Sequence, residues 1–275
     1  MARLDAHQHF WRYSPQTHGW IDDSMAVLKR DFLPPDLEPL LKRRGYDGCV
    51  AVQAEMTVAE SHWLLDLADR HPFIRGVVGW VDLCSPDVAD ALAPLAKRPK
   101  LRGIRHIVQA EPDDFMRRPD FQRGIAALAP LGLTYDVLVY HRQLPAALDL
   151  VERFPGQKFV VDHVAKPDIK AGLRHPWAPH MRALARHPNV FCKVSGMVTE
   201  ADWHAWIPAQ LEYYLDVVFD AFGPERIMIG SDWPVCLLAA DYDRTMSVVE
   251  EYVGRLPAKA GEAVLGETAA RFYGI

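Results

Sequence analysis

Residues 48–81 read GCVAVQAEMTVAESHWLLDLADRHPFIRGVVGWV, and the fold of the whole chain can be predicted from the pattern of this stretch. Two short apolar runs, Gly48–Glu55 and Arg75–Val81, flank an amphipathic helix that we predict over Val58–Arg70. Nearly continuous apolar runs are typical of parallel strands that are covered on both faces. The stretch therefore predicts a strand–helix–strand unit of an α/β protein.

The same unit recurs along all 275 residues. Strands are predicted at Leu4–Phe10, Gly48–Glu55, Arg75–Val81, Leu101–Val108, Thr134–His141, Lys158–His163, Asn189–Ser195 and Arg226–Asp232. Helices are predicted at Pro35–Arg44, Val58–Arg70, Asp87–Lys97, Pro119–Ala129, Leu144–Phe154, Trp177–Arg186, Ile207–Phe222, Tyr242–Arg255 and Lys259–Tyr273. Eight alternations favour a single-domain (β/α)₈ TIM barrel over residues 1–275 rather than an open doubly wound sheet. The sequence contains no GxGxxG motif and no P-loop, which weakens the open, nucleotide-binding alternative.

The composition narrows the choice of partners. Hydrophobic residues make up 49% of the chain, and the net charge of −5 without a basic run argues against nucleic-acid binding. The cysteines Cys49, Cys84, Cys192 and Cys236 form no CxxC pair, so we expect reduced thiols. The N-terminal residues lack a signal-peptide pattern, and no run is long enough to span a membrane. We expect a cytoplasmic protein with no membrane partner, and the sequence leaves its oligomeric state open.

Polar residues gather where the predicted strands end. His7 and His9 are two residues apart on the first strand, so their imidazoles point to the same side. At the mouth of a barrel such a pair can share a metal ion or a substrate oxygen. An isolated HxH is more often two unrelated surface histidines, but His163 ends the sixth strand and Asp232 the eighth. The alternative role for Asp232 is to cap the following helix.

Several other strand ends carry weaker candidates. Strict alternation makes Asp162, beside His163, point away from the barrel axis, and we expect it to bond a helix or a loop there. The remaining candidates at strand ends are Gln53, Glu55, Arg105, His106, Tyr140, His141, Arg142, Lys193 and Ser195. The long segment 11–34 should form a loop at the ligand-binding end. Its aromatic residues, Trp20 among them, could supply an apolar wall for a sugar ring.

Four motifs carry a resemblance to a known family. They are DAHQHFW at residues 5–11, DHVAKP at 162–167, NVFCKVSGM at 189–197 and PERIMIGSDWPV at 224–235. Together they resemble the amidohydrolase superfamily, in particular its branch of TIM-barrel metal-dependent hydrolases that contains sugar lactonases. Within that branch, DAHQHFWRY, QAEMTVAES and the loop with His18, Gly19 and Trp20 look most like L-fuconolactonases and L-rhamnonolactonases. The resemblance covers essentially the whole chain.

The resemblance implies roles for individual residues. His7 and His9 match the paired histidines after the first strand, and Asp232 matches the superfamily's general base. Many members carry a carboxylated lysine at the end of the fourth strand that bridges two metal ions, but this chain has Arg105 there. We therefore expect at most one divalent ion, with Zn²⁺ the first choice, held by His7, His9 and Asp232. Related lactone hydrolases work without a metal, so the resemblance does not require the ion for activity.

The implied reaction is attack of water on the carbonyl of an aldonolactone, L-fuconolactone or a close relative. Asp232 would act as general base, with His163 and Arg105 as the other catalytic residues. Gln53, Glu55, His141, Lys193 and Trp20 would bind the sugar. Two alternatives stay open: an aromatic-acid decarboxylase of the same superfamily, and a barrel that binds a sugar without turnover.

Overall fold

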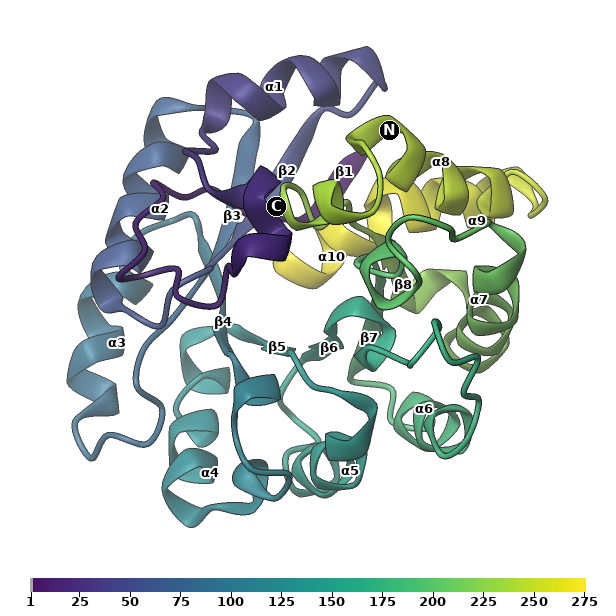
Figure 1. Cartoon of the computed structure of the whole chain (residues 1–275). Helices are drawn as coiled ribbons and strands as arrows, with labels where there is room; N and C mark the ends of the chain where they lie inside the picture. Colours follow the sequence, from purple (N-terminus) through teal and green to yellow (C-terminus); the bar gives the residue numbers. More distant parts are fainter. Residues whose placement is uncertain (1) are drawn as a thin grey trace.

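Eight parallel strands form the centre of the molecule in the computed structural model, which describes residues 2–275 (Figure 1). They are β1 (Leu4–Gln8), β2 (Gly48–Val52), β3 (Ile74–Gly79), β4 (Leu101–His106), β5 (Thr134–Val137), β6 (Phe159–Val161), β7 (Val190–Val194) and β8 (Ile227–Ile229). Each strand pairs with the next in chain order. Just beyond the strand ends, the Asp232 amide donates to the His7 carbonyl at 2.8 Å and the His9 amide to the Trp233 carbonyl at 2.7 Å. These bonds bring the last strand back to the first, and the predicted (β/α)₈ barrel is confirmed.

Helices pack around the strands, all but the last of them on the outside of the barrel (Figure 1). They are α1 (Pro34–Arg43), α2 (Val58–Arg70), α3 (Val88–Ala96), α4 (Pro119–Ala126), α5 (Leu144–Arg153), α6 (Trp177–Ala185), α7 (Ala209–Phe222), α8 (Tyr242–Val253), α9 (Ala258–Glu262) and α10 (Thr268–Tyr273). The predicted last helix is interrupted, because a π-helical stretch at Ala263–Glu267 joins α9 to α10. The predicted loop after β1 contains a short 3₁₀ helix, Asp23–Leu28, and is tied down by backbone bonds between Trp11 and Phe32.

The C-terminal helix α10 packs against the interior of the barrel. Phe272 and Tyr273 belong to one buried cluster with Leu4, Val50 and Met228, which come from β1, β2 and β8. Parallel strands bury both faces, so the inner face needs apolar cover at the end away from the ligand. The helix therefore supplies apolar contacts to the barrel interior, and it also brings the Tyr273 hydroxyl to the buried Asp136 at 2.8 Å.

Two features of the described residues bear on the predictions from composition. All four cysteines are free, and Cys49, Cys192 and Cys236 are buried. Within residues 2–275, none of the helices combines the length and the apolar character that crossing a membrane would require.

A buried carboxyl group anchors the loop that follows β2. The Glu60 side chain accepts hydrogen bonds from the Ala54 and Glu55 amides, each at 2.8 Å, and so fixes the backbone beside Gln53. Burial raises the pKa of Glu60 to about 8, although the two hydrogen bonds oppose the rise. Glu60 therefore keeps its proton in the folded protein at a pH where it loses the proton in the unfolded chain.

We predict that this proton makes stability fall as pH rises between about 4.5 and 8. In that window the native state binds more protons at Glu60 than the unfolded state, so the contribution to the unfolding free energy declines by at most about 1.4 kcal/mol per pH unit. Urea unfolding of the parent and of Glu60→Gln at pH 5, 6, 7 and 8 measures it. The difference in unfolding free energy between the two proteins should change steadily across this range. A difference that is constant with pH would contradict the prediction.

Candidate functional site

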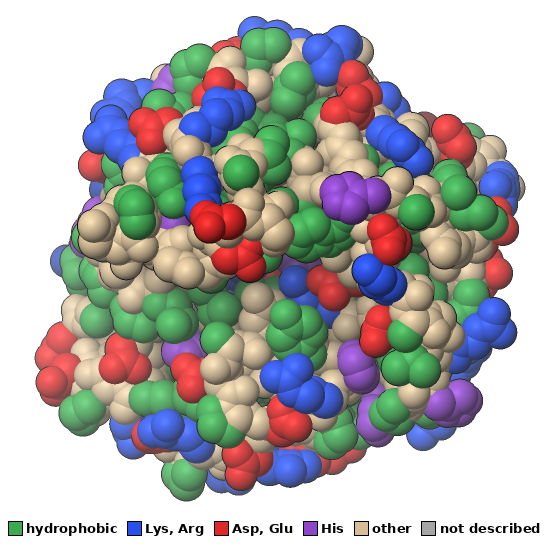
Figure 2. All heavy atoms as spheres, viewed as in Figure 1, with side chains coloured by type: hydrophobic (Ala, Val, Ile, Leu, Met, Phe, Trp, Pro, Cys, Tyr) green, Lys and Arg blue, Asp and Glu red, His purple; other side chains and the backbone are tan. Residues whose placement is uncertain are grey.

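Four side chains predicted from three strand ends meet at one end of the barrel. The Nε2 atoms of His7 and His9 lie 3.2 Å apart, and Oδ1 of Asp232 is 3.2 Å from His9 Nε2. The same oxygen is 3.7 Å from the Nε2 atoms of His7 and His163. The face of the molecule in Figure 2 is hollowed near its centre, over the carboxyl ends of the strands. The structure thus brings these four side chains together in one cluster.

The backbone is strained where two of these side chains leave their strands. Asp232 has a φ of 55°, and His163 begins a left-handed turn in which Val164, with a φ of 47°, is the most unfavourable member because it is β-branched. The Trp177 indole donates to the Val164 carbonyl at 2.6 Å and helps to hold the turn. Such strain persists only where surrounding contacts enforce it, and here it turns both side chains toward the mouth.

The expectation that Asp162 points outward is wrong. Asp162 is fully buried inside the barrel, where Oδ2 accepts from Arg105 at 3.2 Å and Oδ1 lies 3.0 Å from the Lys193 ammonium. The reason is that β6 ends at Val161, one residue before Asp162, and the chain then enters the left-handed turn. Alternation holds only for extended backbone, so Asp162 and His163 can both face inward.

The donor atoms at the mouth suit a divalent cation. His9 donates from Nδ1 to the Val52 carbonyl at 2.8 Å, so in the neutral imidazole Nε2 carries a lone pair that faces the Asp232 carboxylate. Two acceptors at 3.2 Å repel each other unless a cation or a proton lies between them. Tetrahedral zinc with bonds of about 2.0–2.1 Å separates its ligands by ~3.3 Å, close to the 3.2, 3.2 and 3.7 Å among His7, His9 and Asp232. The three residues form one of two groups in the described chain that could hold a metal.

Burial and neighbouring charges keep the Asp232 carboxylate ionised and the imidazoles of His7 and His163 neutral. Burial alone would raise the pKa of Asp232, but the histidines that surround its carboxylate hold that pKa below the usual value, so the carboxylate stays ionised. Burial lowers the pKa of His163 to about 4. Burial, reinforced by the Lys193 charge, also holds the pKa of His7 well below its usual value. A cation at the mouth would therefore meet an ionised Asp232 carboxylate and a neutral His7 imidazole.

Lys193 lies beneath the mouth instead of on its surface. Its ammonium contacts Asp136 at 2.5 Å, Asp162 at 3.0 Å and His7 Nδ1 at 3.1 Å, and the side chain has no exposed area. All of these partners are protein atoms, so the position suits support of His7 better than the sugar contact that the sequence suggested.

Arg105 also makes its hydrogen bonds to other protein atoms. It donates to the carbonyl and the side-chain oxygen of Gln53 and to Asp162, and its Nη1 approaches His7 Nε2 at 3.4 Å. Gln53 is left with a buried side-chain nitrogen that has no hydrogen-bond partner. A buried donor without a partner is costly, so this nitrogen is available to a ligand oxygen.

Three further sugar-binding candidates lie around the rim. The Glu55 carboxylate is 3.7 Å from Nε2 of the buried His18, an atom that also lacks a hydrogen-bond partner. His141 is half-buried and its Nδ1 lies 3.2 Å from the Lys166 carbonyl. Trp20 is 44% exposed and packs edge-on against Trp11. These positions leave polar and aromatic groups near the mouth free to meet a ligand.

Two features of the site were not singled out from the sequence. Asp136 lies in the middle of the buried strand β5 and balances Lys193, and a charge inside an apolar run is a signal that could have revealed it. Lys166 ends the left-handed turn and pairs with Glu200 at 3.0 Å. The position of Lys166 depends on the left-handed turn, which no pattern in the local sequence predicts.

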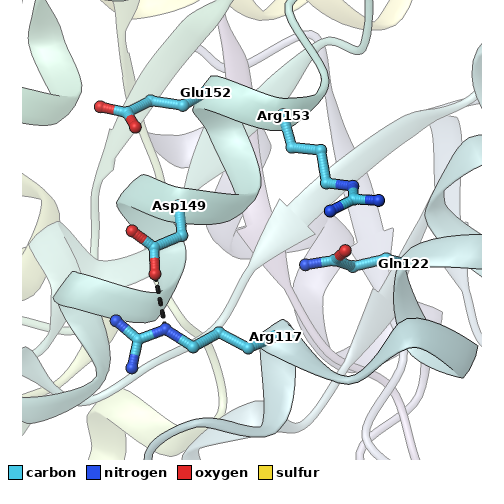
Figure 3. Close-up of a pocket in the computed structure, with 5 residues that line it drawn as sticks. All are labelled: Arg117, Gln122, Asp149, Glu152 and Arg153. Atoms are coloured by element: carbon cyan, nitrogen blue, oxygen red, sulfur yellow. Dashed lines mark hydrogen bonds and ion pairs between the residues drawn. The ribbon is translucent and has the colours of Figure 1, made fainter.

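A second recess, on the outer surface between α4 and α5, has a different character (Figure 3). It is lined by Arg117, Gln122, Asp149, Glu152 and Arg153. Arg117 pairs with Asp149 at 2.5 Å, and both side chains are about half exposed. Its two guanidinium groups and two carboxylates balance each other, and none of its residues ends a strand, so we assign it no catalytic role.

Comparison with known proteins places the chain in a family. The model of the amidohydrolase family matches residues 4–275, and the chain belongs to that family. An L-fucono-1,5-lactonase of Burkholderia multivorans is 44% identical over 99% of this chain and 96% of its own length. An L-fucono-1,5-lactonase of Burkholderia ambifaria is 42% identical over the same shares. The resemblance inferred from the sequence motifs is thereby confirmed.

Solved structures extend the comparison. A crystal structure of an amidohydrolase from Burkholderia multivorans with bound zinc has a TM-score of 0.95 and 43% identity, with full coverage of both chains. A second crystal form with bound HEPES has a TM-score of 0.96. A dihydroxybenzoic acid decarboxylase from Polaromonas has a TM-score of 0.70 but only 12% identity, which shows a shared fold alone.

We predict that Gly196→Ala disturbs the site more than the fold. Gly196 has a φ of 58°, and a Cβ there would lie 2.5 Å from His163 Nδ1 and 3.1 Å from Asp232 Oδ2. The added methyl group must displace His163, so kcat should fall at least tenfold, in line with the sensitivity of active sites to shifts of about 1 Å. Gly132→Ala is the matched control, because Gly132 also has positive φ (69°, in the left-handed helical region) but nothing lies within 4 Å of its added Cβ. Equal losses of kcat in the two variants would contradict the prediction.

Proposed function

We propose that this protein hydrolyses a sugar lactone, with L-fucono-1,5-lactone as the preferred substrate. The observation that carries the proposal is the convergence of His7, His9, His163 and Asp232 at one mouth, in a chain 42–44% identical over nearly its whole length to L-fucono-1,5-lactonases. Support for the 1,5-ring comes from the names of these relatives.

Asp232 starts the proposed reaction. Its ionised carboxylate takes a proton from water, and the water oxygen forms a bond to the lactone carbonyl carbon. The carbonyl oxygen becomes an oxyanion, and in this proposal His163 stabilises it by donating a hydrogen bond. The bond from the carbonyl carbon to the ring oxygen then breaks, and Asp232 returns its proton to the leaving alkoxide. The product is the open hydroxy acid, and no other reactant is consumed.

His7, His9 and Asp232 are the proposed ligands of one divalent ion, with Zn²⁺ the expected choice. Lewis acidity toward the carbonyl oxygen is the chemistry that such an ion supplies when it is bound. The chain's own residues orient the substrate in either case. We infer that the ion assists the reaction but is not essential, because a lactone is an activated ester and the mouth already holds a base and hydrogen-bond donors.

The rim provides contacts suited to a sugar. Gln53 offers an unpartnered buried donor, and Glu55 and His141 are half-buried polar groups that can bind ring hydroxyls. Trp20 presents an exposed aromatic face for the C–H side of the ring. These features favour a polyhydroxylated substrate over a planar aromatic acid, and so favour the lactonase over the decarboxylase alternative.

We predict that L-fucono-1,5-lactone is opened with a higher kcat/KM than any amide, phosphate ester or aromatic acid. A pH-indicator assay over a panel of aldonolactones measures acid release, and loss of ultraviolet absorbance follows an aromatic acid. Chelator-treated protein should retain part of the lactonase activity. Cleavage of amides or phosphate esters with no lactone turnover would refute the proposal, and lactone binding by calorimetry without product would identify a binding protein.

We predict that Asp232→Asn lowers kcat by a factor of about 10²–10⁴, because general-base catalysis typically supplies that much. KM and the melting temperature should change little, since an amide still hydrogen-bonds water or a hydroxyl group. If Asp232 only capped the turn after β8, asparagine would replace it almost equally well and kcat would stay near normal. In that case the base lies elsewhere, and His163 is the next residue to substitute.

A further inference from the structure

The His7 imidazole lies between two cationic side chains. The Lys193 ammonium is 3.1 Å from Nδ1, and the Arg105 guanidinium is 3.4 Å from Nε2. Both groups can only donate hydrogen bonds, and a neutral imidazole has one accepting nitrogen. His7 can therefore accept from only one of them, and its other nitrogen must carry the proton.

The other neighbours of His7 indicate which of its two nitrogens carries the proton. His9 donates from Nδ1 to the Val52 carbonyl, so the lone pair on His9 Nε2 faces His7 Nε2 at 3.2 Å. A proton on His7 Nε2 satisfies this acceptor and leaves Nδ1 to accept from Lys193 at 3.1 Å. A proton on Nδ1 would instead use Asp162 at 3.4 Å and Arg105 at 3.4 Å. The arrangement with the proton on Nε2 uses the two shorter contacts, 3.2 Å to His9 and 3.1 Å to Lys193.

A divalent ion at the mouth requires the second arrangement. Coordination by His7 Nε2 needs its lone pair, so the proton must be on Nδ1. Asp162 Oδ1 then accepts that proton, as outer carboxylates commonly do for metal-bound histidines. Lys193 can give up its hydrogen bond to Nδ1, because its ammonium also contacts Asp136 at 2.5 Å and Asp162 at 3.0 Å.

We propose that His7 changes tautomer when the site takes up a metal ion, and that Lys193 is a positioning residue that favours the metal-free tautomer. The proton leaves Nε2 and one is taken up at Nδ1, so His7 stays neutral and Lys193 keeps its charge. Lys193 thus weakens metal binding and keeps both nitrogens of His7 hydrogen-bonded without the ion. The inference rests on the proposed metal-binding role of His7, His9 and Asp232.

The direct test is the protonation pattern of His7, read from ¹H–¹⁵N correlation spectra of protein labelled with ¹⁵N-histidine. Spectra are taken after chelator treatment and again with saturating Zn²⁺, and comparison with His7→Gln assigns the His7 signals. We expect Nε2–H without the ion and Nδ1–H with it. Nδ1–H in the metal-free protein would overturn the proposal.

The role of Lys193 is tested by the Zn²⁺ dissociation constant, measured by competition with a chromogenic chelator. Outer-shell changes typically alter metal affinity by about 10- to 100-fold, so Lys193→Met should tighten Zn²⁺ binding at least tenfold and should show Nδ1–H before zinc is added. Lys158→Met is the control, because Lys158 is exposed and no contact joins it to the site. Unchanged affinity and tautomer in Lys193→Met would overturn the assignment.

A charge-balanced variant covers the case in which Lys193→Met fails to fold. Lys193→Met with Asp136→Asn removes one buried cation and one buried anion together, so a gain in affinity there reports the tautomer and not the net charge. The spectra of the parent protein distinguish failure of the proposed metal ligands from failure of the tautomer exchange. Absence of zinc binding would refute the proposed ligands as well, whereas zinc binding without a change at His7 would refute the tautomer exchange alone.

Discussion

The ion cluster on the barrel axis is the interaction on which the rest of the site depends. Lys193 reaches from β7 to Asp136 on β5 and to Asp162 after β6, with no exposure to solvent. An unpaired charge at this depth would cost several kcal/mol, and removing one partner of a buried pair typically costs about 3–5 kcal/mol. The cluster therefore fixes three strand ends relative to one another, and His7 and Arg105 are held against its upper side. Tyr273 of α10 completes it from the other side.

Above this cluster, hydrogen bonds fix the orientation of the side chains that form the mouth. His9 is locked by a backbone carbonyl, His163 by the Ser195 hydroxyl at 2.9 Å, and Gln53 by Arg105. Positive φ angles at His163 and Asp232 show that the fold accepts local strain to aim these side chains. This strain lowers the stability of the fold, but it holds donors and acceptors in position before a substrate arrives. Such preorganisation is the main source of electrostatic catalysis.

The molecule separates a rigid centre from a more varied rim. Metal-type donors and buried charges occupy the centre, and aromatic and half-exposed polar groups such as Trp20, Glu55 and His141 occupy the loops around it. Related folds with decarboxylase activity share the architecture at 12% identity, so the barrel itself does not select the reaction. In the proposed reaction, the rim selects the carbonyl compound and the centre activates water.

The sequence by itself determined the barrel and most of the mouth. Eight apolar runs alternating with helices have few arrangements that bury both faces of every strand, and the carboxyl ends of parallel strands must meet, so His7, His9, His163 and Asp232 could be brought together from spacing alone. Side-chain direction past the end of a strand could not be determined in this way. Asp162 points inward because the chain leaves β6 through a left-handed turn, and that turn is enforced by contacts such as the one from Trp177, which lies 13 residues from Val164. The partnership of Lys193 with Asp136, 57 residues away, likewise exists only once the barrel is closed, because a buried charge finds its partner across the structure and not along the chain.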